Sequence, residues 1–390
     1  MKNAEKKIIT EVDSSELLSR GGIEIIRSPD DFFRLSERYS VPVPEIRYID
    51  LNRTGIFLPN AEVRVGYRAR FITGSDDLRR KKTWFALPVR SERDSAYRVR
   101  NGGLYFNDER IAEIGRVDLD TCDVSYQRGP NLINLNSRSR GSCGGCHACV
   151  HNYKNLYDGT VLKDQAQLIT KDQIETFFKD KEKNGLDISE LQQIAVVTGL
   201  FGSEADVVEH MEKIDAVVQP KGFNGELMYF GCEVNSDEAL RRLSRLGKFS
   251  LIYAIDNFTK RSKILAERKS VITIEGAKDT LNRAKKQGIE TTFAYIIGID
   301  DLDSMKNGFE FLMDSITRFP VINIYQIQTE GQLKIMDKAA RSLEFYVKGR
   351  IILEKLFRDK EMLPRRWENY RPLWYDFFDG RPLPANTFGD

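Results

Sequence analysis

Short apolar runs alternate with amphipathic segments in the chain from about residue 126 onward. Between the runs, apolar residues recur every three or four positions, as on one face of a helix. This alternation is typical of βα units and predicts a parallel sheet. Six such units in one run favour a curved, partly closed barrel over an open doubly wound sheet. In both folds, ligands bind at the C-terminal ends of the strands. The predicted strands are 132–135, 194–197, 227–230, 251–255, 292–297 and 322–327.

The helices between these strands have recognisable ends. Thr170 and Gln173 stand three positions apart, as in a capping box, and Ser236 precedes two acidic residues as an N-cap should. Apolar residues then follow one helical face over 274–284, and Gly288 stands where a helix would end. The sequence therefore predicts three helices at these places.

Residues 1–125 lack this rhythm. Short alternating runs, such as 62–68, are separated by prolines and predict a β-rich segment. Residues 64–110 contain 12 Lys and Arg against 6 Asp and Glu, with seven aromatic residues among them. Such a stretch suits binding of phosphates or bases. A solvated face over an ordinary β core explains it better.

The chain is predicted to have three parts. We expect an N-terminal accessory domain at 1–125 that covers or recognises the substrate, and a barrel at 126–337. Residues 338–390 begin with a long helical pattern and end in a tail rich in proline and aromatic residues, which we expect to pack on the barrel. The predicted fold class is α/β. It is a partial (β/α)6 TIM-like barrel with a β-rich accessory domain and a helical, aromatic C-terminal tail.

Composition narrows the class of protein. Lys and Arg (60) balance Asp and Glu (58), and 41% of the residues are hydrophobic, which excludes a polycation and a disordered chain. No stretch reaches the ~18 apolar residues of a membrane helix. The charged N-terminal segment has no apolar region typical of a signal peptide. We therefore expect a cytoplasmic protein with reduced thiols and no membrane partner.

Three of the five cysteines form a cluster, Cys143-Gly-Gly-Cys146-His-Ala-Cys149. In a reducing compartment such clustering indicates a metal site. A bacterial ferredoxin run needs a fourth cysteine four positions further on, where this chain has a tyrosine. Two interpretations remain open. One is a structural zinc site completed by His147 or His151. The other is a [4Fe–4S] cluster held by three thiolates, with one iron open to a ligand.

Segments that follow the predicted strands share a further pattern. Residues 132–138 lead into the cysteine loop, 195–204 contain a stretched Gly-Gly-Glu element, and 254–257, 295–301 and Gln326 follow later strands. In this order they resemble the radical S-adenosylmethionine (SAM) enzymes over roughly residues 130–330. The cysteine spacing of two and two residues differs from the usual three and two of that family.

The resemblance implies a cofactor site. Cys143, Cys146 and Cys149 would hold a [4Fe–4S] cluster, and SAM would chelate its open iron. The segment 195–204 is similar to the element that holds the methionyl amino group, 254–257 to a ribose contact, and 295–301 to the adenine frame. One basic side chain after the fourth strand would meet the cofactor's carboxylate. The implied SAM contacts are Thr198, Gly199, Glu204, Asp256, Arg268, Ile296, Ile297 and Gln326.

The resemblance also implies the chemistry. An electron from a flavodoxin- or ferredoxin-like partner would reach the cluster, and SAM would be cleaved to methionine and a 5′-deoxyadenosyl radical. That radical would abstract hydrogen from a small metabolite, such as a nucleoside, a sugar or a natural-product intermediate. Two alternatives stay open. The first is a radical SAM enzyme that modifies RNA, which the basic stretch would serve. The second is a zinc-stabilised binding protein without catalysis.

Cys232 is a candidate catalytic residue. It follows the predicted strand 227–230, so its thiol would lie at the barrel mouth. There it would return a hydrogen atom to a substrate radical. The competing interpretation is a small buried apolar residue, a common role for free cysteine.

Overall fold

The computed structural model describes most of the chain. The described residues are 22–58, 67–73, 81–90, 94–119, 125–129, 131–137, 146–149, 167–197, 201–327, 329–369 and 371–383. No helix among them is long and apolar enough to cross a membrane.

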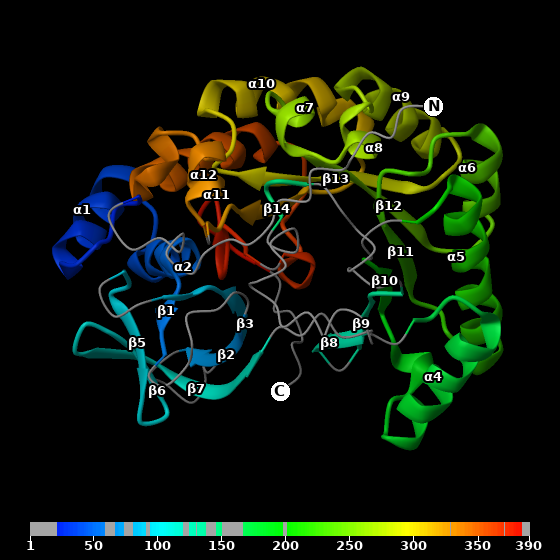
Figure 1. Cartoon of the computed structure of the whole chain (residues 1–390), viewed down its shortest axis with the longest axis horizontal. Coiled ribbons are helices and arrows are strands. Elements are labelled where there is room, and N and C mark those ends of the chain that lie inside the picture. Colours follow the sequence, from blue (N-terminus) through cyan, green and yellow to red (C-terminus); the bar gives the residue numbers. More distant parts are fainter. Residues whose placement is uncertain are drawn as a thin grey trace, which may run out of the picture.

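Six parallel strands form the curved sheet that the sequence predicts (Figure 1). Within the described residues the strand order is β14-β13-β12-β11-β10-β9-β8, and β8 is antiparallel to β9. The prediction of a partial (β/α)6 barrel is confirmed; β8 was not predicted. The strands are β8 (Ser125–Gly129), β9 (Leu132–Leu135), β10 (Gln193–Val196), β11 (Glu226–Gly231), β12 (Phe249–Asp256), β13 (Glu290–Ile297) and β14 (Val321–Ile324).

Helices cover the convex side of this sheet (Figure 1). The capping box at Thr170 is present, Ser236 caps its helix, and Gly288 has a φ of 77° just past the end of another, so the three predicted helix ends are confirmed. The helices are α4 (Lys171–Lys183), α5 (Glu204–Val218), α6 (Asp237–Leu243), α9 (Ile274–Lys286), α10 (Leu302–Leu312) and α12 (Leu343–Phe357).

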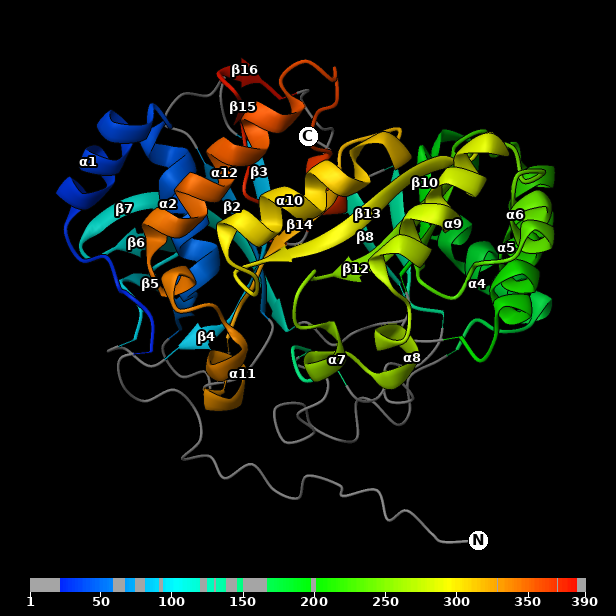
Figure 2. The same cartoon turned by 90° about the horizontal axis from the view of Figure 1, so that it is seen from above.

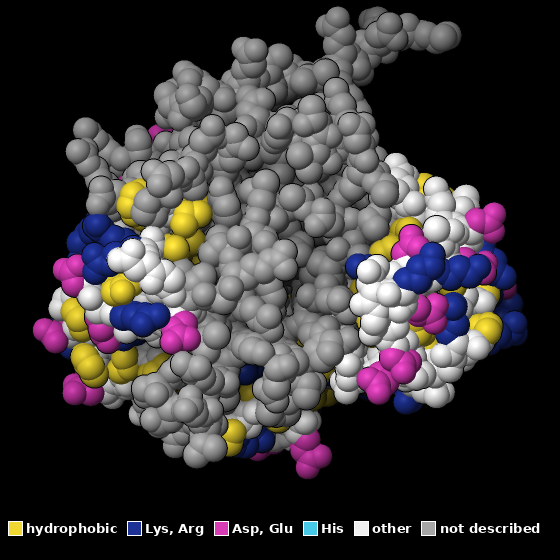
Figure 3. Space-filling model, turned by 90° about the horizontal axis from the view of Figure 1, so that it is seen from below, with side chains coloured by type: hydrophobic (Ala, Val, Ile, Leu, Met, Phe, Trp, Pro, Cys, Tyr) yellow, Lys and Arg dark blue, Asp and Glu magenta, His cyan; other side chains and the backbone are white. Residues whose placement is uncertain are grey.

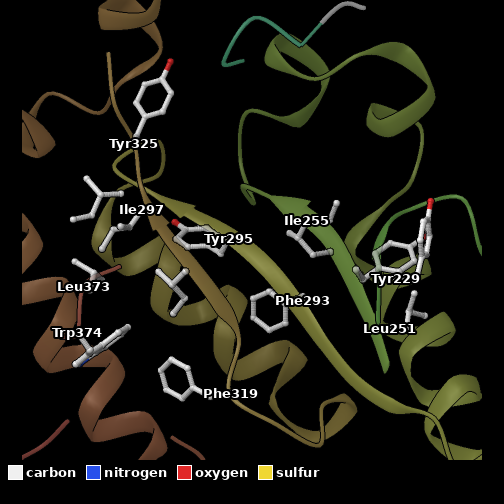
Figure 4. Packing of buried hydrophobic residues seen from close by; sticks show 14 of the residues in the cluster. Tyr229, Leu251, Ile255, Phe293, Tyr295, Ile297, Phe319, Tyr325, Leu373 and Trp374 are labelled. Atoms are coloured by element: carbon white, nitrogen blue, oxygen red, sulfur yellow. The ribbon is translucent and has the colours of Figure 1, made fainter. Parts of the chain in front are cut away.

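Strand side chains alternate between two apolar clusters. Residues such as Leu251 and Phe293 pack under the helices, as Figure 4 shows, in the large core. The alternate residues form a smaller cluster on the other face, where Ala195 and Ala294 are small. The strands are therefore buried on both faces, which explains their continuous apolar runs.

Shorter elements complete the barrel. Three connect or follow strands at their C-terminal ends: α7 (Arg261–Ile264), α8 (Glu267–Ser270) and α11 (Glu330–Ile335). The remaining short elements are η6 (Ile188–Glu190), η7 (Gln219–Lys221), η8 (Met313–Ser315), η9 (Ala339–Arg341), η10 (Arg366–Glu368), β15 (Phe377–Phe378) and β16 (Arg381–Pro382).

The C-terminal tail packs on the helices of the barrel. The Trp374 ring centroid lies 5.2 Å from that of Phe319 and 5.4 Å from that of Phe378. Figure 4 shows Leu373 and Trp374 beside Phe319. The indole N–H of Trp374 donates to Glu354 on α12 over 2.9 Å, so its one polar atom is satisfied in the core.

The N-terminal part contains a mixed sheet and two helices. Within the described residues the strand order is β3-β2-β7-β6-β5-β1-β4, which confirms the β-rich prediction. The elements are α1 (Pro29–Tyr39), α2 (Val43–Thr54), β1 (Ile56–Phe57), β2 (Tyr67–Thr73), β3 (Lys81–Leu87), β4 (Val89–Arg90), β5 (Tyr97–Arg100), β6 (Gly103–Phe106) and β7 (Glu109–Leu119).

The helix α2 lies between the N-terminal sheet and α12 and also contacts β14 (Figure 1). Gln326, just after β14, donates to the Asn52 carbonyl over 2.8 Å. Arg53 donates to the Arg341 carbonyl over 3.0 Å, and Arg90 on β4 donates to the Ile327 carbonyl. The N-terminal part is thus fixed beside the C-terminal end of β14.

Charged side chains gather at the opposite, N-terminal ends of the strands. Arg318 lies 2.9 Å from Glu226, 3.0 Å from Glu290 and 3.0 Å from Glu368. Arg365 also pairs with these three carboxylates, at 3.2–3.4 Å. Because Glu226 and Glu290 begin β11 and β13, this network ties the C-terminal part to that end of the sheet and leaves the C-terminal strand ends for a site.

Candidate functional site

The described candidate residues lie at the C-terminal ends of the strands. Cys232 follows β11, Asp256 ends β12, Ile296 and Ile297 end β13, and Gln326 follows β14. Three candidates, Cys143, Thr198 and Gly199, lie outside the described residues. Among the residues that are described, no three His, Cys, Asp or Glu side chains are placed to hold a metal ion.

Residues 146–149 form a turn in which the Cys149 N–H donates to the Cys146 carbonyl over 3.0 Å. Three further hydrogen bonds fix this turn. The Ala266 N–H donates to Cys146 Sγ over 3.2 Å, and the His147 N–H donates to the Ile264 carbonyl over 2.7 Å. Gln332 on α11 donates to the Ala148 carbonyl over 3.3 Å. The cysteine turn is therefore attached to the segments that follow β12 and β14.

Both cysteines of this turn are half-buried. Burial raises the pKa of the Cys146 thiol, while the Lys269 ammonium and the Ala266 N–H oppose that rise because both stabilise a thiolate. The N–H···S bond and the Lys269 charge thus offset part of the effect of burial on this thiol.

Residues 261–272, which contain α7 and α8, connect several parts of the site; we call them the α7–α8 bracket. Arg268 donates to the Phe201 and Gly202 carbonyls, both over 2.8 Å, and so fixes the loop before Glu204. Arg261 is 7% exposed and donates to the Ile255 carbonyl at the end of β12. Figure 2 shows α7, α8 and α11 on the same side of the curved sheet.

Asp256 has an unusual backbone. Its φ is 66°, in the left-handed region, and the β12–β13 register shifts between Ala254 and Asp256. Its carboxylate Oδ2 accepts a hydrogen bond from Lys269 Nζ over 2.8 Å. A non-glycine residue held in this conformation at a strand end is typical of functional sites.

Glu204 begins α5, and its side chain reaches the start of α6. Oε1 accepts hydrogen bonds from the backbone N–H groups of Asn235 and Ser236, the latter over 2.7 Å. The carboxylate thus fixes the loop after Cys232, a contact that the sequence did not indicate.

Cys232 is 3% exposed. Its N–H donates to Glu233 Oε2 over 2.8 Å, and its carbonyl accepts from the Tyr253 hydroxyl over 3.3 Å. Burial raises the pKa of its thiol to about 12, with the Lys269 charge opposing and Glu233 adding to the rise. The thiol therefore stays protonated at neutral pH.

The end of β13 uses its backbone for internal contacts. The Ile297 carbonyl accepts from the Tyr325 N–H over 2.9 Å, and the Gly298 carbonyl accepts from the Asp337 N–H over 2.9 Å. Ile297 is buried, whereas Ile296 is partly exposed. Of this pair, Ile296 is the side chain that a ligand reaches more easily.

Two polar residues at this end were not singled out as site residues from the sequence. His210 is buried, and its Nε2 lies 2.7 Å from Ser137 Oγ, just before the cysteine loop. Asp300 is buried and accepts from the Phe258 and Thr259 N–H groups over 2.7 and 3.0 Å. Asp300 follows a predicted strand, and His210 lies on a helix that faces one. These positions in the sequence were the signals that could have indicated the two residues.

No family model and no curated protein matches the chain. Among solved structures, it is similar to SuiB of Streptococcus suis bound to S-adenosylmethionine, at 9% identity over 55% of this chain and 45% of that chain, with a TM-score of 0.37. It is also similar to TsrM of Kitasatospora setae, a radical S-adenosylmethionine methyltransferase with cobalamin and a [4Fe–4S] cluster bound, at 10% identity over 48% and 32%, with a TM-score of 0.33.

A third similar structure is coproporphyrinogen III oxidase (HemN) of Escherichia coli, described as a radical SAM enzyme. The identity is 12% over 57% of this chain and 50% of that chain, with a TM-score of 0.34. The chain thus spans half or less of the length of each of these three structures.

Proposed function

We propose that this protein is a radical SAM enzyme that acts on a small metabolite. One observation carries the proposal: the Cys146–Cys149 turn is hydrogen-bonded to the α7–α8 bracket, and the same bracket binds Asp256 and the loop before Glu204. Three segments that resemble the cluster, ribose and methionyl elements of the family are therefore held by one short stretch of chain.

The residues present fit a [4Fe–4S] cluster. Cys146 and Cys149 lie in one turn, Cys143 precedes them by two glycines, and thiolates are the ligands such clusters use. The N–H donor and the ammonium near Cys146 suit an anionic cluster. The side chain of His147 is exposed, which supports the cluster over a zinc site closed by that histidine.

When bound and reduced, the cluster would supply the electron that cleaves SAM; this chain's residues would bind and orient. Asp256 would accept hydrogen bonds from ribose hydroxyls, and the chain at Ile296 would lie against adenine. Arg268 would hold the loop before Glu204 in place, since the Phe201 and Gly202 carbonyls accept its hydrogen bonds. The protonated Cys232 thiol would donate a hydrogen atom to the substrate radical, and the external electron donor would return an electron, with a proton, to the thiyl radical left on its sulfur.

A small metabolite is the proposed substrate. The N-terminal part is fixed beside β14 through Gln326 and Arg90, where it would cover the mouth of the barrel. Within its basic stretch, Arg100 pairs with Asp108 at 3.1 Å. In Figure 3 the described Lys and Arg side chains lie among Asp and Glu side chains on both flanks.

Anaerobic purification with iron and sulfide quantitation tests the class. We expect about four iron and four sulfide per chain, and 5′-deoxyadenosine after reduction in the presence of SAM. Replacement of Cys146 by Ala should abolish both, and replacement of Cys232 by Ala should leave the cluster intact. One zinc without iron or sulfide would contradict the proposal and favour a zinc-stabilised binding protein.

Filter binding to RNA at several salt concentrations separates the two substrate classes. An enzyme for small metabolites should bind weakly at every salt concentration. A steep loss of affinity with rising salt would show phosphate contacts and would favour the RNA-modifying alternative.

A further inference from the structure

Lys269 occupies a central place in the α7–α8 bracket. It lies on α8, three positions after Ala266, whose N–H binds Cys146 Sγ. Residues three apart lie on one face of a helical turn. Lys269 and Ala266, whose N–H binds the sulfur, therefore lie on the same face of this turn. The Lys269 carbonyl in turn accepts a hydrogen bond from Arg261 over 2.9 Å, which fixes the backbone of this turn.

The ammonium of Lys269 is largely removed from solvent. Its side chain is 18% exposed, and that of its partner Asp256 is 15% exposed. The Asp256 carboxylate is its ion-pair partner, with Lys269 Nζ 2.8 Å from Oδ2. Burial lowers the pKa of Lys269, but the Asp256 carboxylate outweighs burial and raises it, so the ammonium keeps its charge at neutral pH.

Asp256 depends on this cation. Among the described residues, Lys269 Nζ is the donor to the Asp256 carboxylate, and it binds Oδ2. The φ of 66° and the shift in register show that the chain departs from ordinary strand geometry at Asp256. Oδ1 remains as an acceptor for a ligand hydroxyl.

We propose that Lys269 is a positioning residue for both parts of the cofactor site: it orients the Asp256 carboxylate for the ribose of SAM and places a fixed positive charge beside the cluster ligand Cys146. This inference rests on the proposed function. It assigns a role to a residue that touches neither the reacting atoms nor, directly, the substrate.

The charge has a predictable effect on the cluster. Reduction adds an electron, so a nearby cation favours the reduced state and a nearby anion disfavours it. Replacing Lys269 by Met should therefore shift the cluster potential to a more negative value. Replacing Asp256 by Asn should shift it the opposite way. Both changes should weaken SAM binding. For Lys269→Met we expect an affinity loss of about tenfold, at the lower end of the range for removing a contact that supports a ligand.

The test uses the full-length, cluster-loaded protein. SAM affinity is measured by anaerobic equilibrium dialysis with radiolabelled SAM, and the cluster potential by a redox titration followed by electron paramagnetic resonance. Lys263→Met is the matched control, since Lys263 is exposed and belongs to the same bracket. It should leave both quantities at the wild-type values. Lys269→Arg, which keeps the charge, should restore most of the affinity and the potential.

The outcomes are distinguishable. Wild-type protein without a cluster or without SAM binding overturns the proposed function and this inference with it. A normal wild type together with an unchanged Lys269→Met variant overturns the inference alone. Cluster loss in both the Met and the Arg variants would assign Lys269 to packing only and also overturns it. Should Lys269→Met not fold, Lys269→Gln takes its place, and an unchanged potential and SAM affinity in that variant overturns the inference.

Discussion

The two ends of the half-barrel strands both bury charge, but they balance it differently. At the N-terminal ends, Arg318 and Arg365 meet three glutamates within one network of the protein's own groups. At the C-terminal ends, a single lysine, Lys269, pairs with a single aspartate, Asp256, at 2.8 Å. The first arrangement gives each carboxylate two cationic partners, whereas Asp256 has one donor among the described residues and can accept a further hydrogen bond.

The largest expected effect of a single change is at the cysteine turn. Cys146→Ala removes a proposed cluster ligand and the sulfur that accepts the Ala266 N–H. Bound iron and 5′-deoxyadenosine formation should both fall to background, because a three-thiolate site has no ligand to spare. Iron analysis and product chromatography measure this. The fold, followed by circular dichroism, should persist; full iron retention would remove Cys146 from the site.

The next largest effect is expected at the other end. Arg318→Met leaves Glu226, Glu290 and Glu368 without their central cation, and the Arg318 side chain is only 6% exposed. The free energy of unfolding in urea should fall by about 3 kcal/mol. Arg358→Met, which breaks an exposed pair with Asp379, is the control and should cost under about 1 kcal/mol. Equal losses in the two variants would refute the difference between a buried network and a surface pair.

A smaller loss is expected just before the cysteine loop. Ser137→Ala removes the hydroxyl that lies 2.7 Å from His210 Nε2 in a buried position. Unfolding free energy should fall by about 1 kcal/mol, as for a typical lost hydrogen bond. Ser244→Ala, whose hydroxyl bonds locally to the Arg241 carbonyl, should change stability less. If the order of these two losses is reversed, the buried bond at His210 adds nothing to the base of the loop.

The last effect appears only at alkaline pH and concerns Cys232. Its folded pKa of about 12 lies above the ordinary value of 9.0, so the folded state disfavours the thiolate. The contribution of the protonated thiol to the free energy of unfolding is therefore fully present below pH 9 and is lost as pH rises from 9 toward 12. Between pH 8 and 10, the wild type should lose about 1.4 kcal/mol more of its free energy of unfolding than Cys232→Ala. If the free energies of unfolding of the two proteins change equally with pH, the thiol ionises as easily in the folded state as in the unfolded state.

Much of the barrel could be predicted from the sequence because its signals are local. Strands buried on both faces read as apolar runs, and the side chains of Thr170 and Ser236 bond to backbone groups three residues away. The helix α2 could not be predicted in this way. It is buried on all sides and includes Asp50 and Arg53, which pair with each other at 2.6 Å, so it shows no single apolar face.

The site was predictable in part. The parallel topology alone places Cys232, Asp256 and Ile296 at the same ends of the strands, and the sequence indicates that topology. The contacts of Lys269 could not be predicted, because they depend on two helices of four residues each. Propensity and periodicity carry little information over so short a span. The interaction of Arg268 with backbone carbonyls was hidden for the same reason.

The junction between the N-terminal part and the barrel has one more consequence. Gln326, Arg53 and Arg90 all donate across it to main-chain oxygens, those of Asn52, Arg341 and Ile327. A backbone carbonyl is present whatever side chain the residue carries, so substitution of an accepting residue leaves the hydrogen-bond acceptor in place. Substitution of Asn52, Arg341 or Ile327 should therefore leave the attachment of the N-terminal part largely in place.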